Sequence, residues 1–248
     1  MADAERQQLI NRLSELAERA DRQGFWTDTE FLTLAEQDIL CALRLAAPFS
    51  LHAGYPDGER KVAAFGSEDI CGCPYISPVV CIKIAPASQK FADKLTHRDF
   101  LGALMGLGVR REVMGDILIA DNVGYLFCLD SIASYIIDGL GEVKRTTVRC
   151  SLSEPPEFLL ESPPLTSVVV ASERLDAIIS AVYLLSRNGG KELIQQGRVF
   201  INSRLTQNPS ASLAPGALVS VRGKGRFAYE GIERETKKGR LRVRVRVY

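Results

Sequence analysis

The order of predicted elements between residues 79 and 150 constrains the fold more than any other feature of the sequence. Apolar runs, turn residues and helical spacing predict a strand, a helix, two strands joined at Asp121-Asn122, a second helix and a last strand. Their ranges are 79–85, 91–107, 116–120, 124–129, 131–140 and 142–150. This β-α-β-β-α-β order is the ferredoxin-like arrangement, which many RNA-recognition modules share.

Two aromatic residues of the third predicted strand, Tyr125 and Phe127, fall on one face of that strand. RNA-recognition modules stack bases on aromatic side chains of their central strands. Aromatic residues at this spacing also form cores, so both interpretations stay open. With nearby basic residues they make a possible second RNA surface: His97, Arg98, Arg110, Arg111, Tyr125 and Phe127.

A second informative stretch, residues 172–227, predicts two short helices followed by strands. A break at Ser186 to Gly190 separates the helices, and Gly197 ends the second one. Basic residues at the helix starts suit a compact nucleic-acid-binding module. The predicted ranges are a first helix from residue 174, a second helix at 191–196, and strands at 198–201 and 217–221.

This stretch resembles the S-four domain, a small RNA-binding module first named from a ribosomal protein. One position departs from that family, because Gly189-Gly190 replaces the usual small residue after the Ser-Arg turn. We therefore expect the second helix to start later than in the family or to be looser. The matching residues are Arg174-Leu175-Asp176, Ser186-Arg187, Leu193-Ile194, Gly197-Arg198-Val199, Asn202 and the run GALVSV at 216–221.

The first 75 residues predict a helical or α+β segment, in which the apolar run at 62–65 can form a strand. Residues 4–23 carry apolar residues along one stripe of an amphipathic helix. A second helix is predicted over 31–46, with Asp28 or Thr29 as its cap. From composition alone, the triplet Glu59-Arg60-Lys61 is expected at a charged loop edge.

Several motifs in combination resemble the YlmH family, bacterial proteins with a C-terminal S-four domain. The resemblance runs from about residue 31 to residue 248. It implies binding to the large ribosomal subunit with peptidyl-tRNA, in rescue or quality control of stalled nascent chains, and a family link to cell division. The motifs are GYPDGERKVAAF at 54–65, HRD at 97–99, LGALM at 101–105, GDI at 115–117, SVRGKGRF at 220–227 and TKKGR at 236–240.

We therefore predict an α+β protein with N-terminal helices, a ferredoxin-like, RRM-like middle domain and a C-terminal S-four (alpha-L) RNA-binding domain. Proline pairs at 155–156 and 163–164 stiffen the chain and indicate a linker between domains. The expected segments are an N-terminal segment at 1–75, the middle domain at 76–152, the linker at 153–166 and the S-four domain at 167–248.

The charge of the chain is distributed unevenly, although its formal sum is only +1. Residues 167–248 hold 15 lysines and arginines against 6 acidic residues, a net charge of +9. The remainder holds 16 against 24, a net charge of −8. A basic end on an acidic body is expected of a protein that presents one end to nucleic acid. No apolar run approaches a membrane span and no apolar signal segment begins the chain, so we expect a cytoplasmic protein without membrane contact.

The basic end alternates cations with glycine from Arg222 to Arg226. Glycine lets the backbone approach a phosphate, while a tight connection between strands explains the same residues, and both can hold. We expect these loops and the helix starts to contact the RNA backbone. The candidate residues are Arg174, Ser186, Arg187, Asn188, Lys191, Arg198, Arg222, Lys224, Arg226, Lys237, Lys238 and Arg240.

Near the C-terminus, four arginines alternate with four apolar residues between residues 240 and 247. Strand geometry places the arginines on one face, about 6.6 Å apart. Like charges in register repel one another, so an anion such as RNA phosphate would stabilise the row. Glu230 and Glu233 are alternative, intramolecular partners for part of it.

The sequence does not predict an enzyme, a cofactor or a metal site. Arg174-Leu175-Asp176 resembles the catalytic tripeptide of RNA pseudouridine synthases, but here it lies inside the S-four pattern. His97-Arg98-Asp99 resembles the kinase catalytic-loop triplet without the other kinase motifs, and is interpreted as helix capping and first-turn charge. Only Cys71 and Cys73 among the six cysteines are close in sequence, and neither histidine completes a zinc pattern.

These features together predict a non-catalytic RNA-binding protein of the translation machinery. The expected partners are ribosomal RNA and tRNA on the large ribosomal subunit, and the expected state is a monomer. The alternatives are an RNA-modification enzyme or its accessory subunit, and an interaction factor associated with cell division.

Overall fold

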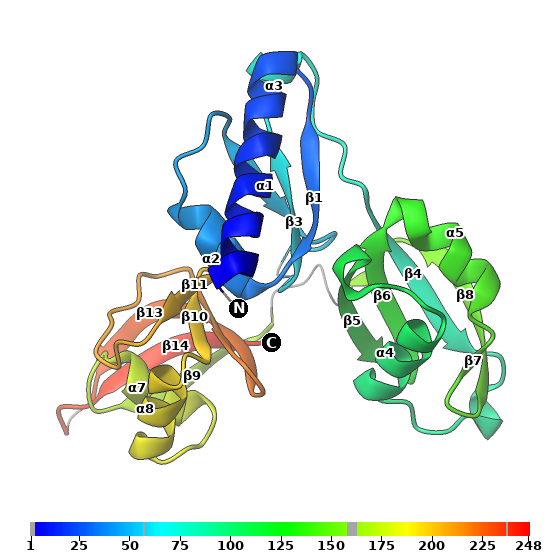
Figure 1. The fold of residues 1–248 in the computed structure, drawn as a ribbon. Coiled ribbons are helices and arrows are strands. Elements are labelled where there is room, and N and C mark those ends of the chain that lie inside the picture. Colours follow the sequence, from blue (N-terminus) through cyan, green and yellow to red (C-terminus); the bar gives the residue numbers. More distant parts are fainter. Residues whose placement is uncertain (1–2, 57, 158–162, 237) are drawn as a thin grey trace. The chain divides into compact units, whose positions relative to one another are not determined.

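A computed structural model describes residues 3–56, 58–157, 163–236 and 238–248, and the chain divides into two units after residue 160 (Figure 1). The first unit holds a small N-terminal sheet with its helices and the middle domain. The second unit holds the basic end of the chain. Both units combine helices and strands, which confirms the α+β class.

The N-terminal part packs helices on a three-stranded antiparallel sheet of order β1-β3-β2. The predicted first helix is confirmed, and its stripe buries Leu13, Ala17 and Ala20. The elements are α1 (Asp3–Gln23), β1 (Thr27–Leu32), α2 (Leu34–Ala42), β2 (Phe49–His52), β3 (Lys61–Phe65) and α3 (Glu68–Cys71).

The predicted helix over 31–46 was wrong at its start, because residues 27–32 form strand β1. The side chains of Thr27 and Thr29 are buried, and both hydroxyls are hydrogen-bonded. The Thr27 hydroxyl donates to the Leu16 carbonyl at 2.9 Å, and the Thr29 hydroxyl accepts from the Ala63 N–H at 2.9 Å. Helix α2 begins only after Thr33, whose N–H and hydroxyl donate to the Glu36 carboxylate at 2.7 and 2.8 Å.

The middle domain has the predicted ferredoxin-like topology, an antiparallel sheet of order β5-β6-β4-β8-β7 with α4 and α5 on one face (Figure 1). The turn at Asp121-Asn122 is confirmed, with φ of 49° and 62°. The elements are β4 (Val79–Pro86), η1 (Gln89–Phe91), α4 (His97–Gly106), η2 (Arg111–Val113), β5 (Met114–Ala120), β6 (Val123–Leu129), α5 (Asp130–Gly139), β7 (Glu142–Val143) and β8 (Thr146–Ser153).

Two boundaries of the middle domain differ from the prediction. Helix α4 begins at His97 rather than residue 91, because the Asp99 carboxylate accepts hydrogen bonds from the N–H and hydroxyl of Thr96 at 2.8 and 2.7 Å. The predicted last strand is a hairpin, since Lys144 adopts a φ of 59° and turns the chain between β7 and β8.

The second unit is a six-stranded antiparallel sheet of order β11-β10-β12-β13-β14-β9, packed on two helices. Strand β9 begins at Leu165, within the stretch predicted as linker, and pairs with β14. Residues 158–162 of that stretch lie outside the described residues. The elements are β9 (Leu165–Val170), α7 (Leu175–Val182), α8 (Arg187–Gln195), β10 (Val199–Ile201), β11 (Arg204–Thr206), β12 (Ala217–Val221), β13 (Gly225–Glu235) and β14 (Leu241–Val247).

The expected late or loose start of the second helix was wrong, because α8 begins directly after Ser186. The Ser186 hydroxyl accepts the Gly189 N–H at 3.1 Å and caps the helix. Gly190 is buried where α8 crosses α7, and a side chain there would collide with the Ser180 hydroxyl. The two glycines therefore belong to the helix, and Gly190 allows the helices to touch.

Among the described residues, no helix is both long enough and apolar enough to cross a membrane.

Candidate nucleic-acid interface

The start of helix α8 presents polar and basic side chains to solvent. Arg187, Asn188 and Lys191 are all exposed on its first turns. The exposed Ser186 hydroxyl accepts the capping bond with one lone pair, and its O–H can still donate to a ligand. The helix thus contributes two cations and one amide to a possible phosphate-binding face.

The backbone N–H groups at the start of α7 are hydrogen-bonded within the protein, so they are not available to an RNA phosphate. The N–H groups of Leu175 and Asp176 donate to the carbonyls of Ala211 and Pro209 at 3.2 and 3.1 Å. Arg174 forms a two-pronged ion pair with the buried Asp176, at 3.0 and 2.8 Å, and this pair lowers the pKa of Asp176. Arg174 therefore serves first as a structural ion-pair partner.

The tip between β12 and β13 is held against the turn before β10. The Arg198 guanidinium donates to the carbonyl of Arg222 at 2.8 Å. Gly223, with a φ of 78°, passes so close that a side chain would lie 2.8 Å from the same guanidinium. Arg222 extends over the Phe200 ring at 5.0 Å, and Lys224 is exposed at the tip.

Arg226, near the start of β13, lies over the ring of Tyr248 at 5.3 Å. The N–H of Tyr248 donates to the carbonyl of Arg226 at 3.0 Å, so the C-terminal residue is fixed beside it. The structure thus brings Arg198, Arg222, Lys224 and Arg226 together at one end of the sheet.

Lys238 and Arg240 lie at the opposite end of β13, in the tip that joins it to β14. Both are exposed, and the tip is closed by the Arg240 N–H on the Thr236 hydroxyl at 3.0 Å. Strand β13 is 11 residues long, which separates the two tips by about 30 Å. The predicted interface is therefore two separate cationic groups. Lys237 lies outside the described residues.

The arginine row on β14 is only partly available to an anion. Arg246 pairs with Glu230 at 2.9 Å, as the alternative prediction allowed, and also donates to the Pro163 carbonyl at 2.8 Å. Arg244 is exposed, whereas the buried Nε of Arg242 has no hydrogen-bond partner among the described residues. The apolar side of the strand is confirmed by the fully buried Val243 and Val245.

The stacking surface predicted on the middle domain is not formed as a pair of rings. Phe127 is fully buried and packs on Tyr55 at 4.6 Å between ring centroids, so it belongs to a core and the stacking prediction was wrong for it. Segment 53–55 covers this half of the sheet face opposite the helices. Tyr125 is half-buried at the border of the same cluster.

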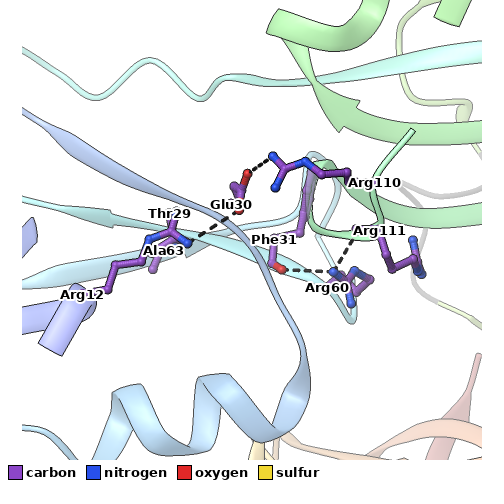
Figure 2. Close-up of polar contacts among 8 residues, drawn as sticks. All are labelled: Arg12, Thr29, Glu30, Phe31, Arg60, Ala63, Arg110 and Arg111. Atoms are coloured by element: carbon purple, nitrogen blue, oxygen red, sulfur yellow. Dashed lines mark hydrogen bonds and ion pairs between the residues drawn. The ribbon is translucent and has the colours of Figure 1, made fainter. Parts of the chain in front are cut away.

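The predicted basic residues of the middle domain have different surroundings. Arg110 pairs with Glu30 at 2.6 Å, whose carboxylate also lies 3.6 Å from Arg12 (Figure 2). Arg111 is half-buried and donates to the carbonyl of Gly115 at 3.0 Å, and burial lowers its pKa. These two arginines join parts of the first unit.

His97 and Arg98 are exposed on the first turn of α4. They lie on one end of a helix, and Asp99 beside them is used in capping, as the sequence predicted. Of the six residues proposed for a second RNA surface, His97, Arg98 and the ion-paired Arg110 are exposed, Arg111 and Tyr125 are partly buried, and Phe127 is buried.

Comparison with known proteins adds independent findings. Residues 79–155 match the family model described as "Putative RNA-binding domain in YlmH", and residues 173–219 match the S4 domain. A Bacillus subtilis (strain 168) protein named "Ribosome-associated protein quality control protein P2" is 32% identical over 225 residues, which cover 87% of this chain and 84% of the relative. This chain belongs to the YlmH family.

A solved structure, "Cell division protein ylmH from Streptococcus pneumoniae", is similar with a TM-score of 0.51 and 19% identity, over 65% of this chain and 98% of that one. At this identity the likeness supports the fold alone. The YlmH and S-four resemblances predicted from the motifs are confirmed. Neither matching family model describes an enzyme.

In this YlmH family member, the motifs GYPDGERKVAAF at 54–65 and GDI at 115–117 contact each other at Asp116. Its carboxylate accepts the Tyr55 hydroxyl at 2.8 Å and the backbone N–H groups of Glu59 and Arg60 at 2.6 and 3.3 Å. Gly115 beside it is packed so closely that a side chain would lie 2.7 Å from the Phe31 ring. We call this arrangement the Asp116 joint. It connects the N-terminal part to the middle domain.

Arg60 completes the Asp116 joint, and its predicted place at a charged loop edge was wrong. Its half-buried guanidinium donates to the carbonyls of Phe31 and Arg111 at 3.0 and 3.1 Å (Figure 2). It also donates to the carbonyl of Met114 at 2.9 Å. Five donors in a planar group suit such a site better than lysine. A charged triplet after a Pro-Asp-Gly turn gave no local signal for this burial.

The cysteines of this YlmH protein are free thiols in the described structure. Burial raises the pKa of Cys81 to about 11 and that of Cys128 to about 12, which disfavours the reactive thiolate. The described residues contain no cluster of three or more potential metal ligands.

Proposed function

We propose that this protein binds ribosomal RNA and tRNA on the large ribosomal subunit, as a monomer without catalytic activity, in quality control of stalled nascent chains. The observation that carries the proposal is the set of exposed cations on the start of α8 and on the β12–β13 tip, which approach each other where Tyr183, just before α8, packs on Phe227 and lies near Gly225. We call it the α8–tip surface. Its exposed cations are Arg187, Lys191, Arg222 and Lys224.

Three properties of the α8–tip surface support RNA as its ligand. Its α8 part lies within the S4 match at 173–219, its tip follows shortly after that match, and both belong to the part of the chain with a net charge of +9. Its loops are held by backbone contacts, so cations are positioned before a ligand arrives. The Bacillus relative is named as ribosome-associated, and the ribosome is an RNA-rich particle.

The chemistry of the surface favours recognition of backbone and shape over base sequence. Arginine and lysine side chains bind phosphate oxygens, which carry no sequence information. Asn188 is the exposed amide at the start of α8 that can reach a base edge. We therefore expect binding to a folded RNA element with weak dependence on its sequence.

The first test is the salt dependence of RNA binding. Replacing Arg187 and Lys224 together by glutamine removes two exposed charges and leaves the backbone bonds of the helix start and the tip in place. The slope of log affinity against log salt should fall by roughly one unit for each phosphate that the variant no longer neutralises. Fluorescence anisotropy with ribosomal RNA fragments and tRNA, across a salt series, measures this slope.

A matched control removes the same charge from the acidic part of the chain. Arg6 and Arg44 are exposed in the N-terminal part, and their double glutamine variant should keep the wild-type slope. If both double variants behave alike, the effect is one of total charge and the assignment to the α8–tip surface is wrong.

The second test asks whether the ribosome is the particle that is bound. The tagged protein should move with the large subunit on a sucrose gradient at low salt and leave it as salt rises. The Arg187 and Lys224 variant should stay at the top. Mass spectrometry of digested tRNA and ribosomal RNA after incubation should show no new modified nucleoside; a new one would contradict the non-catalytic proposal.

A further inference from the structure

Leu184, in the turn between α7 and α8, is the large apolar side chain most open to solvent among the described residues, at 93% exposure. Its backbone adopts a φ of 51°, in the left-handed region that leucine rarely occupies. This conformation carries a steric cost, because the Cβ atom crowds the following carbonyl oxygen. A fully exposed leucine does not recover that cost by packing within the chain.

The neighbours of Leu184 hold the turn from both sides. Tyr183 points inward and packs edge-on against Phe227, with 6.1 Å between ring centroids. Its hydroxyl lies 3.8 Å from the position that a side chain at Gly225 would take. Leu185 packs on the core, and its N–H donates to the Ser180 carbonyl at 2.8 Å. The turn is therefore fixed, with Leu184 directed outward.

The same contacts place Leu184 within the α8–tip surface. Arg187 and Asn188 follow it by one turn of chain, and the Tyr183 hydroxyl brings the turn up to Gly225, next to the exposed Lys224. Apolar surfaces that bind proteins are depleted of charge at their centres. A single apolar side chain among cations instead suits RNA, because RNA has a charged phosphate backbone and bases with flat apolar faces.

We propose that Leu184 packs against the face of an unpaired base and its ribose in the bound RNA, while Arg187 and Lys224 contact the flanking phosphates. Base faces are covered in a continuous duplex and become accessible in loops and bulges. Leu184 therefore selects RNA elements with an unstacked nucleotide. This inference rests on the proposed function and names the class of RNA element that the surface recognises.

The test is the variant Leu184→Asn. Asparagine adopts the left-handed conformation more readily than leucine, so the melting temperature of the protein should stay equal or rise. Binding to an RNA hairpin with one bulged nucleotide should weaken about fivefold to tenfold, because part of the apolar burial is removed. In both RNAs a non-nucleotide linker closes the stem, so that no loop base is accessible. Binding to the fully paired hairpin should then not change, and the salt slope should be that of the wild type.

A fluorescent purine analogue at the bulge provides a direct readout of packing. Its emission should change when the wild-type protein binds and change less with Leu184→Asn. Leu184→Met retains an apolar side chain and should keep wild-type affinity. Ile76→Asn removes a comparably exposed side chain, at 87%, from the first unit and should have no effect.

Binding measurements with the bulged hairpin, the paired hairpin and the large ribosomal subunit distinguish whether Leu184 contacts RNA or protein. Equal affinity of the wild type and Leu184→Asn for the bulged hairpin overturns the inference, while the slope measured for the Arg187 and Lys224 variant still judges the proposed function separately. If Leu184→Asn binds both hairpins normally but leaves the large subunit, then Leu184 contacts a protein and the RNA inference is wrong.

Discussion

Arg198 and Arg222 hold each other's loops through two hydrogen bonds that run in opposite directions. The Arg198 guanidinium donates to the Arg222 carbonyl at 2.8 Å, and the Arg222 N–H donates to the Arg198 carbonyl at 2.9 Å. Two residues predicted from the sequence to contact RNA are thus also the support of the β12–β13 tip. A substitution that breaks these bonds should therefore loosen the tip, an effect that is not expected from losing a phosphate contact alone.

Replacing Arg198 by lysine keeps the charge and removes the planar group that reaches the carbonyl. The tip should open more often, so the Lys224 amide, which donates to Val221 at 2.9 Å, should exchange with solvent faster. Hydrogen exchange measured by mass spectrometry reports this. RNA affinity should fall a few-fold with an unchanged salt slope; a reduced slope would show that Arg198 itself contacts phosphate.

Alanine substitutions at Gly190 and at its neighbour Gly189 test whether the crossing of α7 and α8 requires a glycine. Alanine at Gly190 would collide with Ser180 and lie 2.7 Å from the Asp176 carbonyl, which forces α7 and α8 apart and should cost about 1–3 kcal/mol. Alanine at Gly189 meets the Ser186 hydroxyl at 3.3 Å and gains helix propensity, so its effect should be close to zero. Thermal unfolding followed by circular dichroism compares them.

The structure also shows how far the sequence determines the fold. The order of elements in the middle domain is confirmed because strand and helix periods are local properties of the chain. Strand β1 was missed because Thr27 and Thr29 are stabilised inside by distant partners, Leu16 and Ala63. The preference of Asp28 and Thr29 for helix caps is also a local property of the chain. In the folded protein, tertiary contacts override this preference and place both residues in strand β1.

The candidate site was predictable in composition but not in arrangement. The motifs identified the cations of α8 and the β12–β13 tip from the S-four pattern and the glycine-rich run that follows it. The separation of Lys238 and Arg240 by the length of β13 depends on strand pairing. The burial of Phe127 depends on segment 53–55, which lies far earlier in the chain and which no period in the sequence reveals.

Asp116 should be essential to the joint between the N-terminal part and the middle domain. In Asp116→Asn, one acceptor oxygen becomes a donor facing the Tyr55 hydroxyl or a backbone N–H, which should destabilise the first unit by about 1–3 kcal/mol. The lone Trp26 of the chain lies in this unit and reports its unfolding by fluorescence.

Asp121→Asn, at the other end of β5, is the control for that substitution. Asp121 has a φ of 49° in an exposed turn, where asparagine is at least as favourable. Its unfolding temperature should equal or exceed that of the wild type. Equal destabilisation by both variants would contradict the role given to Asp116.

Acid should loosen α7 through Asp176. The bond to Arg174 lowers the pKa of this buried carboxylate below its usual range. A lowered folded-state pKa contributes stability that is present above the ordinary carboxyl pKa and is lost as pH falls through the folded-state pKa. In Arg174→Gln the pKa of Asp176 should rise, so exchange of the α7 amides should accelerate at a higher pH than in the wild type. Coincident pH profiles would exclude this coupling.

Lys238 and Arg240 should act only on ligands large enough to reach both ends of β13. The strand places them about 30 Å from Lys224, so a short RNA hairpin held at the α8–tip surface ends before it reaches them. The double variant Lys238→Gln and Arg240→Gln should therefore bind the hairpin normally, yet leave the large ribosomal subunit at a lower salt concentration than the wild type. Anisotropy with the hairpin and sedimentation with the subunit separate the two effects. Weaker hairpin binding would mean that both cationic groups contact one small RNA, which the length of β13 does not allow in this fold.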